Sequence, residues 1–322
     1  MNPLVLPVDE NSIARAAALL REGKLVAFPT ETVYGLGADA TNGPAVAAIY
    51  AAKGRPSFNP LIIHVAEPRA LDNLIEWNDT ARLLASSLWP GPLTLILPRK
   101  NDSPISLLAS AGLDTLAVRI PSHPAAQKLL RAVNLPIAAP SANASGKLSP
   151  TTPIHVAESL GNKVDLILAG GRSQIGVEST VVNLASPQPS ILRPGGVTQE
   201  QLEMILGYKL PLYDAPAEST DAPPSPGMLA SHYAPHLPVR LNAENIGDRE
   251  AYLAFGPDSF VKGGAARLNL SPQGDLSEAA ANLFAMLREL DKPIYSGIAV
   301  APIPNTGLGV AINDRLSRAA VR

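Results

Sequence analysis

The sequence predicts an α/β fold: a twisted sheet of mixed parallel and antiparallel strands with flanking helices, followed by a smaller α/β domain. Three observations support this prediction. Apolar runs of strand length alternate with helical patterns along the chain. The runs after Val164 follow one another closely, which favours some antiparallel pairing. Residues 211–238 contain seven prolines in 28 positions, which is typical of an extended, semi-rigid linker.

The first elements are predicted from capping and turn residues. Asn11 or Ser12 can cap a helix that continues through Leu20–Arg21 and ends at Gly23. An apolar strand, Lys24–Phe28, follows that glycine. The chain therefore begins with a helix that leads directly into the sheet.

A second helix is predicted over 44–53, because Pro44 suits the first turn of a helix. The apolar strand Leu61–Val65 comes next. Further strands are predicted at 93–97, 115–120, 135–139, 164–168, 180–184 and 190–193. Further helices are predicted near 70–76, 79–88, 123–133, 153–160 and 198–206.

The smaller domain is predicted after the proline-rich segment. Strands are expected at 239–242, 251–255 and 294–300, with helices near 275–290 and 307–320. His232 and His236 have the spacing of metal ligands on a helix, but Pro235 interrupts that helix, and we assign no metal site.

Composition limits the classes of function. With 322 residues, 46% of them hydrophobic, the chain is long enough for two domains with cores of their own. Residues 1–212 carry 17 Lys and Arg against 16 Asp and Glu, which leaves 9 against 12 for the rest. Neither part has the basic excess of a nucleic-acid-binding protein. The absence of cysteine excludes disulfides, zinc–thiolate sites and thiol nucleophiles.

The N-terminal segment MNPLVLPVDENS lacks the basic region and the long apolar core of a secretory signal. No apolar run approaches the length of a membrane span. We therefore expect a cytoplasmic protein that does not associate with a membrane.

Residues 28–64 bring together groups suited to an anionic ligand. An apolar strand leads to the hydroxyls of Thr30 and Thr32, and a glycine-rich bend follows. The next helix ends in Lys53-Gly54-Arg55, and His64 lies in the strand after it. Guanidinium and ammonium groups match phosphate or carboxylate oxygens. The combination predicts a binding site.

Each of these groups also has an ordinary structural explanation. Lys and Arg favour the last turn of a helix, glycine favours the residue after it, and a histidine inside an apolar strand is more often a core residue. The segment does not match the known phosphate loops. Gly35-x-Gly37-x-x-Ala40 is followed by Thr41-Asn42-Gly43-Pro44 and not by a helix, and no G-x-x-x-x-G-K-[ST] occurs.

Later segments raise similar alternatives. Arg119 lies inside an apolar strand, where its charge is costly unless it is paired or reaches water at an edge. Pro140-Ser141-Ala142-Asn143 follows a strand at its carboxyl end, where α/β sheets collect ligands, but such a segment is also typical of a plain turn. The same two interpretations apply to Ser149 and to Arg193 with Pro194-Gly195-Gly196.

Several ordered motifs together resemble the threonylcarbamoyl-AMP synthases, whose catalytic domain has a YrdC-like fold. The motifs are FPTETVYGLG at 28–37, KGRPSFNPL at 53–61, PSAN at 140–143, GVEST at 176–180, LRPGG at 192–196, SPGM at 225–228, HYAP at 232–235, GLG at 307–309 and NDR at 313–315. The resemblance covers essentially the whole chain. It implies a YrdC-like catalytic domain over 1–210, a proline-rich linker or lid over 211–238, and a small Rossmann-like α/β domain over 239–322.

The resemblance also implies roles for individual residues. Lys53 and Arg55 are expected to be catalytic. The residues expected to bind threonine are Thr32, His64, Arg119, Ala139, Ser179 and Thr180. The residues expected to bind ATP are Arg55, Asn59, Thr115, Ser141, Asn143, Ser149, Arg193 and Tyr233. Ala139 stands where some relatives carry a hydroxyl, so only its backbone is expected to contact substrate.

The implied reaction makes L-threonylcarbamoyl-AMP from L-threonine, bicarbonate and ATP, with release of pyrophosphate. It is the first step in the synthesis of N6-threonylcarbamoyladenosine in tRNA. Mg²⁺ is expected with ATP, held by phosphate oxygens and water, because no acidic cage is visible in the sequence. The product is expected to pass to a tRNA threonylcarbamoyl transferase, and stable nucleic-acid binding is not expected.

Two other classes of function stay open at this point. An RNA-binding module would present Lys53, Arg55, Arg119 and Arg193 on a concave basic face. The near-neutral charge, with only seven tyrosines and two tryptophans, argues against it. A different ATP-dependent ligase or carbamoyl-transfer enzyme would use the same fold, since fold does not determine substrate.

The segment Ser225–Pro235 contains Met228, His232 and Tyr233, bulky groups that a plain spacer does not need. We expect it to lie across the ligand cleft as a lid, with Tyr233 reaching the nucleotide, and to exclude water from labile intermediates. The alternative is a tether whose Tyr233 packs on the second domain. Many relatives have basic residues between the methionine and the histidine, whereas this chain has Leu-Ala-Ser, so no phosphate contact is expected there.

Overall fold

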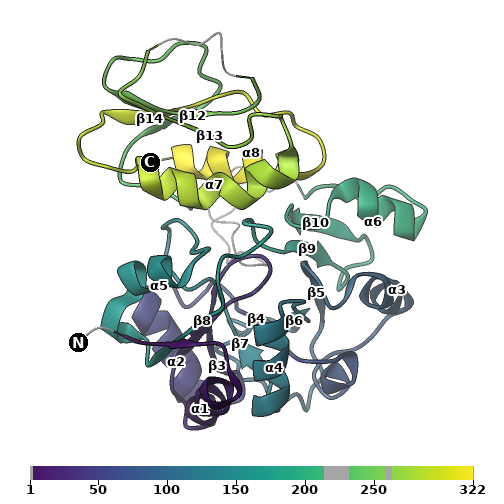
Figure 1. The fold of residues 1–322 in the computed structure, drawn as a ribbon. Coiled ribbons are helices and arrows are strands. Elements are labelled where there is room, and N and C mark those ends of the chain that lie inside the picture. The colour runs from purple at the N-terminus through teal and green to yellow at the C-terminus, as the bar shows by residue number, and fades with distance from the viewer. Residues whose placement is uncertain (1–2, 214–231, 258–262, 322) are drawn as a thin grey trace.

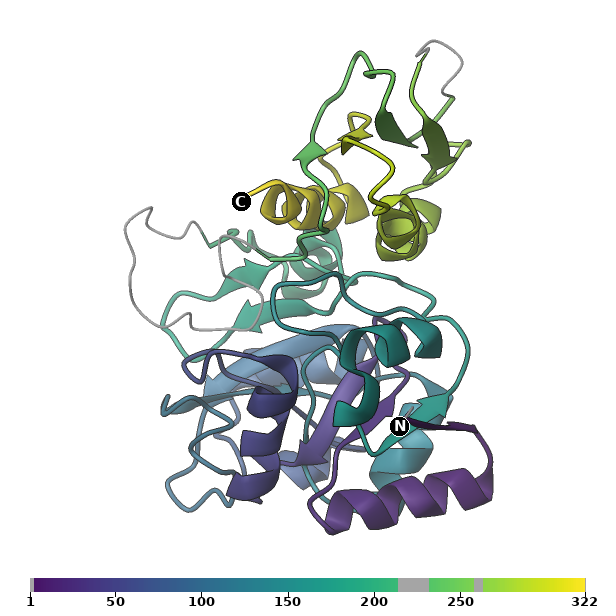
Figure 2. The same ribbon diagram turned by 90° about the vertical axis from the view of Figure 1, so that its left-hand side faces the viewer.

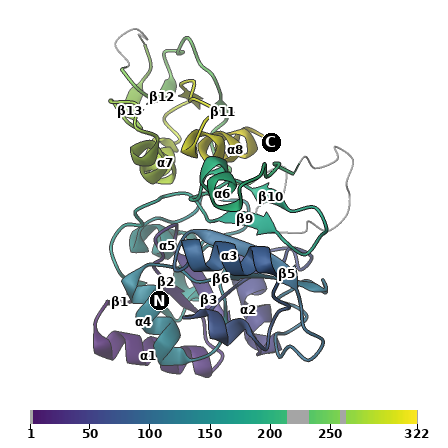
Figure 3. The ribbon, with the colours of Figure 1, turned by 90° about the vertical axis from the view of Figure 1, so that its right-hand side faces the viewer.

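The computed structural model describes residues 3–213, 232–257 and 263–321. In the first domain ten strands form one mixed sheet, and in the second domain, residues 239–321, four strands form a parallel sheet. Two helices of the second domain lie between its sheet and the first domain in all three ribbon views (Figures 1, 2 and 3). The α/β class and the mixed sheet predicted from the sequence are confirmed.

The strands of the first domain follow the order β1-β8-β2-β3-β7-β4-β6-β5-β9-β10 across the sheet. Their bounds are β1 (Leu4–Pro7), β2 (Val26–Phe28), β3 (Gly35–Asp39), β4 (Ile62–His64), β5 (Leu93–Pro98), β6 (Thr115–Arg119), β7 (Ile137–Ala138), β8 (Leu166–Ala169), β9 (Thr180–Asn183) and β10 (Ser190–Arg193). β9 and β10 pair antiparallel, as the short spacing after Val164 predicts. β8 instead pairs parallel with both β1 and β2.

The helices of the first domain are α1 (Glu10–Arg21), α2 (Gly43–Lys53), α3 (Asp79–Leu88), α4 (Pro124–Val133), α5 (Pro153–Leu160) and α6 (Gln199–Leu206). The cap of α1 is Asp9, whose carboxylate accepts from the Ser12 N–H at 2.7 Å, so the prediction of Asn11 or Ser12 is wrong. The aspartate sits three residues before the N–H that it caps, as is usual at a helix start. The helix predicted near 70–76 is also wrong, since only a short 3₁₀ turn forms, at Pro68–Leu71.

Strand β3 was not predicted, because its sequence GLGAD is poor in β-forming residues. Packing explains the glycines. A Cβ on Gly37 would lie 2.8 Å from Cε1 of Phe28 and 3.0 Å from Cγ2 of Ile137. The side chains of Phe28 and Ile137 therefore occupy the space that a side chain at position 37 would need, which favours glycine there. β3 lies between β2 and β7 in the sheet.

The second domain has strands β11 (Val239–Arg240), β12 (Glu250–Ala254), β13 (Ala266–Asn269) and β14 (Gly297–Val300), in the order β11-β14-β12-β13. Its helices are α7 (Leu276–Leu290) and α8 (Leu308–Ala320). β13 was not predicted. None of the helices in the described ranges has both the length and the apolar character that a bilayer crossing requires.

The two domains share a hydrophobic cluster. Val33, Leu148 and Val177 of the first domain pack in the same cluster as the buried residues of α7 and α8. At Gly176 the contact leaves no room for a side chain, because a Cβ there would lie 2.3 Å from the Ala280 carbonyl oxygen of α7. The domains therefore pack directly against each other. Of the predicted linker 211–238, only 211–213 and 232–238 are within the described residues.

Candidate active site

One pocket collects many of the predicted site residues. Its lining consists of Thr30, Thr32, Val33, Tyr34, Gly35, Arg55, Ile62, His64, Arg119, Ala139, Pro140, Ser141, Glu178, Ser179, Arg193, His232 and Tyr233. A concave site with several converging polar groups is the usual form of a site for a small molecule or cofactor.

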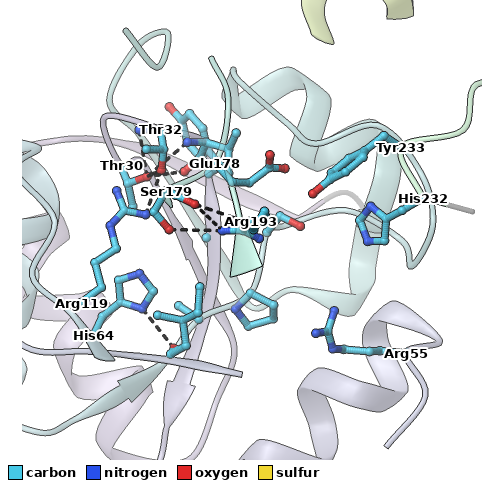
Figure 4. Close-up of a pocket in the computed structure, with 17 residues that line it drawn as sticks. Thr30, Thr32, Arg55, His64, Arg119, Glu178, Ser179, Arg193, His232 and Tyr233 are labelled. Atoms are coloured by element: carbon cyan, nitrogen blue, oxygen red, sulfur yellow. Dashed lines mark hydrogen bonds between the residues drawn. The ribbon is translucent and has the colours of Figure 1, made fainter. Parts of the chain in front are cut away.

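The polar groups of the pocket lie in two sets (Figure 4). On one side are Thr30, Thr32, His64, Arg119 and Ser179, which we call the Arg119 end. On the other side are Arg55, His232 and Tyr233, which we call the Arg55 end. Arg193 lies between the two sets.

The Arg119 end is built around a buried ion pair. The guanidinium of Arg119, at the end of β6, donates from Nη2 to Glu31 Oε1 at 2.6 Å, from Nη1 to Thr32 Oγ1 at 3.0 Å and from Nε to the Gly91 carbonyl at 3.3 Å. Glu31 Oε2 also accepts from the Ser122 N–H at 3.1 Å. Arg119 is thus paired inside the protein, and the alternative of a head group in water at an edge strand does not hold.

His64 contributes an uncharged ring to the same end. It lies in β4, and its Nδ1 is 3.1 Å from the Ile62 carbonyl oxygen, which can only accept, so Nδ1 carries the proton. Burial lowers the pKa of His64 to about 3, and the neighbouring Arg119 cation acts in the same direction. The ring meets Phe28 edge to face at a centroid distance of 6.4 Å. His64 is therefore neutral at physiological pH.

Ser179 and Arg193 connect the two ends. Arg193 donates from Nη2 to the Ser179 carbonyl at 2.9 Å and to Ser179 Oγ at 3.2 Å. The hydroxyl of Ser179 also lies 2.8 Å from that of Thr94. Gly195 makes this contact possible, because a Cβ there would lie 2.3 Å from the Glu178 carbonyl oxygen. The LRPGG segment is thus a turn that presses Arg193 onto the GVEST segment.

Glu178 faces the pocket as a carboxylate. Its Oε1 accepts from Ser149 Oγ at 2.5 Å, and its Oε2 accepts from Arg315 Nε at 2.8 Å. Desolvation by burial pushes its pKa up, but Arg315, Arg193 and the Ser149 hydroxyl outweigh burial and bring the pKa to about 2. Glu178 is therefore ionised and fully engaged by the protein.

Arg55 is positioned by the end of α2. Gly54 takes a left-handed conformation with φ of 60° and ends the helix, and Arg55 then turns back on its own loop. Its Nη2 donates to Asn59 Oδ1 at 2.6 Å and to the Pro60 carbonyl at 2.9 Å. Nη1 has no hydrogen-bond acceptor within the described residues. Arg55 therefore keeps donor capacity for a ligand.

Lys53, which is expected to be catalytic, is engaged by backbone carbonyls. Its Nζ donates to the carbonyls of Ser141 and Asn143, each at 2.5 Å, and Lys53 does not line the pocket. Desolvation holds its pKa well below the usual range for lysine, and the charge of Arg55 acts in the same direction. Lys53 fixes the PSAN loop that forms one wall of the pocket.

The bridging segment, residues 232–238, meets both domains. The His232 N–H donates to the Arg318 carbonyl of α8 at 3.3 Å, and the Ala234 N–H donates to the Gly146 carbonyl of the first domain at 2.8 Å. Between them Tyr233 has a φ of 60°. The centre of its ring lies 5.5 Å from the centre of the Phe284 ring of α7. Tyr233 thus packs on the second domain and also lines the pocket, so both expectations for it describe part of the arrangement. Positions 225–231 of the expected lid lie outside the described residues.

Nine of the predicted site residues line the pocket: Arg55, Thr32, His64, Arg119, Ala139, Ser179, Ser141, Arg193 and Tyr233. Six do not: Lys53, Asn59, Thr115, Asn143, Ser149 and Thr180. Three of these residues contact lining groups or their neighbours. Asn59 accepts from Arg55, Ser149 donates to Glu178, and the Asn143 carbonyl accepts from Lys53 in the loop that carries Ser141. Thr180 Oγ1 donates to the Val197 carbonyl and ties the two segments together. Thr115 begins β6, at the opposite end of that strand from Arg119.

Sequence reasoning gave no role to Glu178 or to His232, although both stand inside quoted motifs. A charged residue in GVEST and a histidine beside Tyr233 were the available signals. Burial lowers the pKa of His232 to about 3 despite the opposing charge of Glu178, so this ring is neutral too.

The arrangement also bears on the RNA-binding alternative. Lys53, Arg55, Arg119 and Arg193 are all buried and hydrogen-bonded within the protein. They line or support a pocket, and their side chains are buried and do not form an exposed basic face, which disfavours electrostatic binding of a polyanion.

The described residues contain no group of three acidic or histidine side chains that could hold a metal ion. Glu178 is the one carboxylate among the lining residues, and Ser149 and Arg315 already occupy both of its oxygens. The donor set therefore does not fit a metal held mainly by the protein.

The chain is similar to known proteins over nearly its full length. A family model described as Telomere recombination (Sua5_yciO_yrdC) matches residues 18–195, and one described as Threonylcarbamoyl-AMP synthase, C-terminal domain, matches residues 197–321. The threonylcarbamoyl-AMP synthase of Bacillus subtilis is 44% identical, covering 98% of this chain and 94% of the relative. That of Pyrococcus abyssi is 42% identical, covering 97% of this chain and 95% of the relative.

The fold agrees with these matches. The crystal structure of P. abyssi Sua5 complexed with L-threonine superposes with a TM-score of 0.90 at 39% identity, covering 99% of this chain and 98% of that one. E. coli YciO, at 24% identity and a TM-score of 0.52, shares the fold over 61% of this chain. With both family models matched in order and relatives above 40% identity along the whole length, this chain belongs to the threonylcarbamoyl-AMP synthase family, in its two-domain form.

Proposed function

We propose that this protein synthesises L-threonylcarbamoyl-AMP from L-threonine, bicarbonate and ATP and releases pyrophosphate, as the first step of N6-threonylcarbamoyladenosine formation in tRNA. One observation carries the proposal: a single pocket joins a set of groups suited to an amino acid to a set suited to phosphates, with Arg193 between them. The names of the full-length relatives and the threonine complex of P. abyssi Sua5 support the choice of substrate.

Threonine would occupy the Arg119 end. Three of the five N–H donors of Arg119 are taken by Glu31, Thr32 and Gly91, which leaves two for the substrate carboxylate. The hydroxyls of Thr32 and Ser179 each make two hydrogen bonds within the protein and keep the capacity for one more, which threonine would use. The neutral His64 adds no further charge there, so the amino group can lose a proton and take up CO₂.

ATP would extend from the middle of the pocket to the Arg55 end. The carbamate oxygen attacks the α-phosphorus, the bond from that phosphorus to the β-phosphate bridging oxygen breaks, and pyrophosphate leaves. Arg193 and Arg55 would neutralise phosphate charge at fixed positions, which is the main contribution that such a displacement needs from a protein.

Mg²⁺ would arrive with ATP and supply further charge neutralisation on the phosphates, ligated by phosphate oxygens and water because the lining offers no free carboxylate. The product is a mixed anhydride that hydrolyses readily, so a transferase must consume it, and we propose a tRNA threonylcarbamoyl transferase. A cytoplasmic location remains a prediction, which cell fractionation would check.

The proposal is tested by mass spectrometry of reactions that contain ATP, threonine and bicarbonate, with each omitted in turn. Threonylcarbamoyl-AMP and pyrophosphate should form only in the complete mixture. Pyrophosphate release without bicarbonate would contradict the proposal and favour a generic ATP-dependent ligase. Equal product formation with serine or alanine would favour a related carbamoyl-transfer enzyme with another substrate.

A further inference from the structure

Arg315 belongs to the second domain, but it forms an ion pair with Glu178 of the first domain. It lies on α8 and is completely buried, with a relative exposure of 0%. Its Nε donates to Glu178 Oε2 at 2.8 Å, across a separation of 137 residues in the chain. Its Nη1 donates to Asp314 Oδ2 at 2.5 Å, which orients the guanidinium from its own helix. A buried arginine with such partners is held in a single orientation.

The same guanidinium also contacts the bridging segment. Its Cζ lies 5.2 Å from the centre of the Tyr233 ring, a cation–π distance. Phe284 of α7 contacts the same ring at 5.5 Å. A left-handed φ is uncommon for a bulky residue and costs about 1 kcal/mol or more, so surrounding contacts must hold Tyr233 in place. Two helices of the second domain supply these contacts.

Glu178 gives this contact its importance. It lines the pocket where, on the proposed function, negatively charged phosphates bind. A carboxylate there would repel them unless a cation neutralised it, and a buried carboxylate without a partner is strongly destabilising. Arg193, the nearby cation within the first domain, bonds to Ser179. Its charge also lowers the pKa of Glu178. Arg315 adds a direct ion pair with the Glu178 carboxylate, at 2.8 Å.

We propose that Arg315 is a positioning residue, through which the second domain supports the pocket in the first domain by fixing Glu178 and, at the Arg55 end, Tyr233. Arg315 does not itself line the pocket. The inference rests on the proposed function for the identity of the ligand. It assigns to the second domain a role in nucleotide binding and none in threonine binding, because the Arg119 end has its own contacts.

The test uses full-length variants Arg315→Met and Arg315→Lys, with Arg240→Met as a control. Arg240 also lies in the second domain and pairs with a carboxylate, but that partner is Glu250 of the same domain. Steady-state kinetics and calorimetric binding of ATP and threonine are measured for each. Arg315→Met should lower kcat/KM for ATP by about 100-fold and raise the Kd for ATP, while the Kd for threonine stays within about threefold. Arg315→Lys should recover part of the loss, because lysine can pair with Glu178 but lacks the planar group over Tyr233. Arg240→Met should match the wild type.

The double variant Glu178→Gln/Arg315→Met separates positioning from general destabilisation. A neutral amide needs no cation beside it, so the double variant should bind ATP at least tenfold more tightly than Arg315→Met. An Arg315→Met protein with wild-type affinity for ATP would overturn the inference. So would equal losses of threonine and ATP binding that the double variant does not recover. If the wild type makes no threonylcarbamoyl-AMP, the proposed function fails, but the comparison of ATP affinities still tests the role of Arg315.

Discussion

The two ends of the pocket are built in different ways. Every residue of the Arg119 end comes from the first domain, and its central cation is held by Glu31, Thr32 and a backbone carbonyl. The Arg55 end takes Arg55 from the first domain and His232 and Tyr233 from the bridging segment, and the second domain supports it.

Unpaired polar atoms lie around the Arg55 end. Within the described residues, Asn59 Nδ2, Asn143 Oδ1 and His232 Nδ1 are buried without a hydrogen-bond partner. Each such atom costs about 1–3 kcal/mol until a partner arrives. Of these atoms only His232 Nδ1 belongs to a residue that lines the pocket. The Arg119 end is therefore fixed by contacts within the first domain, whereas the Arg55 end depends on the bridging segment and the second domain. Four experiments would break or sharpen this contrast.

The largest effect is expected at Arg119. Arg119→Met should abolish threonine binding, a loss of about 1,000-fold or more, and lower the free energy of unfolding by about 3–5 kcal/mol, because it leaves the buried Glu31 carboxylate without its cation. Calorimetry and urea denaturation measure the two effects. The double variant Glu31→Gln/Arg119→Met should recover much of the stability but no threonine binding. Recovery of binding as well would show that the pair is only structural. Arg69→Met, at an exposed pair with Glu67, is the control.

A smaller effect is expected at Arg55. Arg55→Ala should lower product formation by about 100- to 1,000-fold, since charge-assisted hydrogen bonds to phosphate commonly contribute a few kcal/mol. The Kd for threonine should change little, because the Arg119 end makes no contact with Arg55. Arg69→Ala should retain full activity. Equal activity of the two folded variants would show that Lys53–Arg55 is only the end of a helix.

The pH dependence of stability compares one histidine from each end. His64 and His232 both have a pKa of about 3, whereas a histidine in the unfolded chain titrates near 6.5. Between these values the unfolded state binds more protons, so the free energy of unfolding falls as the pH drops below 6.5, by at most about 1.4 kcal/mol per pH unit for each histidine. Urea denaturation at pH 7 and pH 5 measures the slope. His64→Gln should reduce this slope by the contribution of one histidine proton. An unchanged slope would mean that His64 is not buried and that the Arg119 end is open to water.

The smallest effect is expected at the Tyr233 hydroxyl. Tyr233→Phe keeps the ring against Phe284 and Arg315 and removes one hydroxyl, so product formation should fall by about fivefold. Tyr233→Ala should cost more, because the packing is lost as well. Steady-state rates decide between the two contributions. Equal rates for both variants would show that the ring contributes no more than its hydroxyl.

Local patterns predicted much of the fold and of the pocket. Caps, prolines and apolar periodicity placed α2, α3 and α5 within a residue of their observed bounds. Most of the residues that line the pocket lie in the short motifs quoted above. Residues that are close in sequence at a strand end or a turn are also close in space.

Contacts between distant residues could not be predicted. The sequence does not show that Arg119 pairs with Glu31, 88 residues away, or that Glu178 pairs with Arg315, 137 residues away. The sequence likewise does not show that Lys53 donates to carbonyls of a loop about 90 residues away. Strand β3 was not predicted, because the prediction relied on β-propensity, which is low for glycine. At Gly37 the packing of Phe28 and Ile137 favours glycine instead.

The hydrophobic cluster shared by the two domains has a thermodynamic consequence. Because Val33, Leu148 and Val177 of the first domain pack with α7 and α8, neither domain can unfold without exposing apolar surface of the other. The free energies of the two domains are therefore coupled, and the described protein should melt in a single cooperative transition, as one calorimetric unit. A chain truncated before the second domain would leave these three side chains uncovered beside the pocket, and it would be prone to self-association.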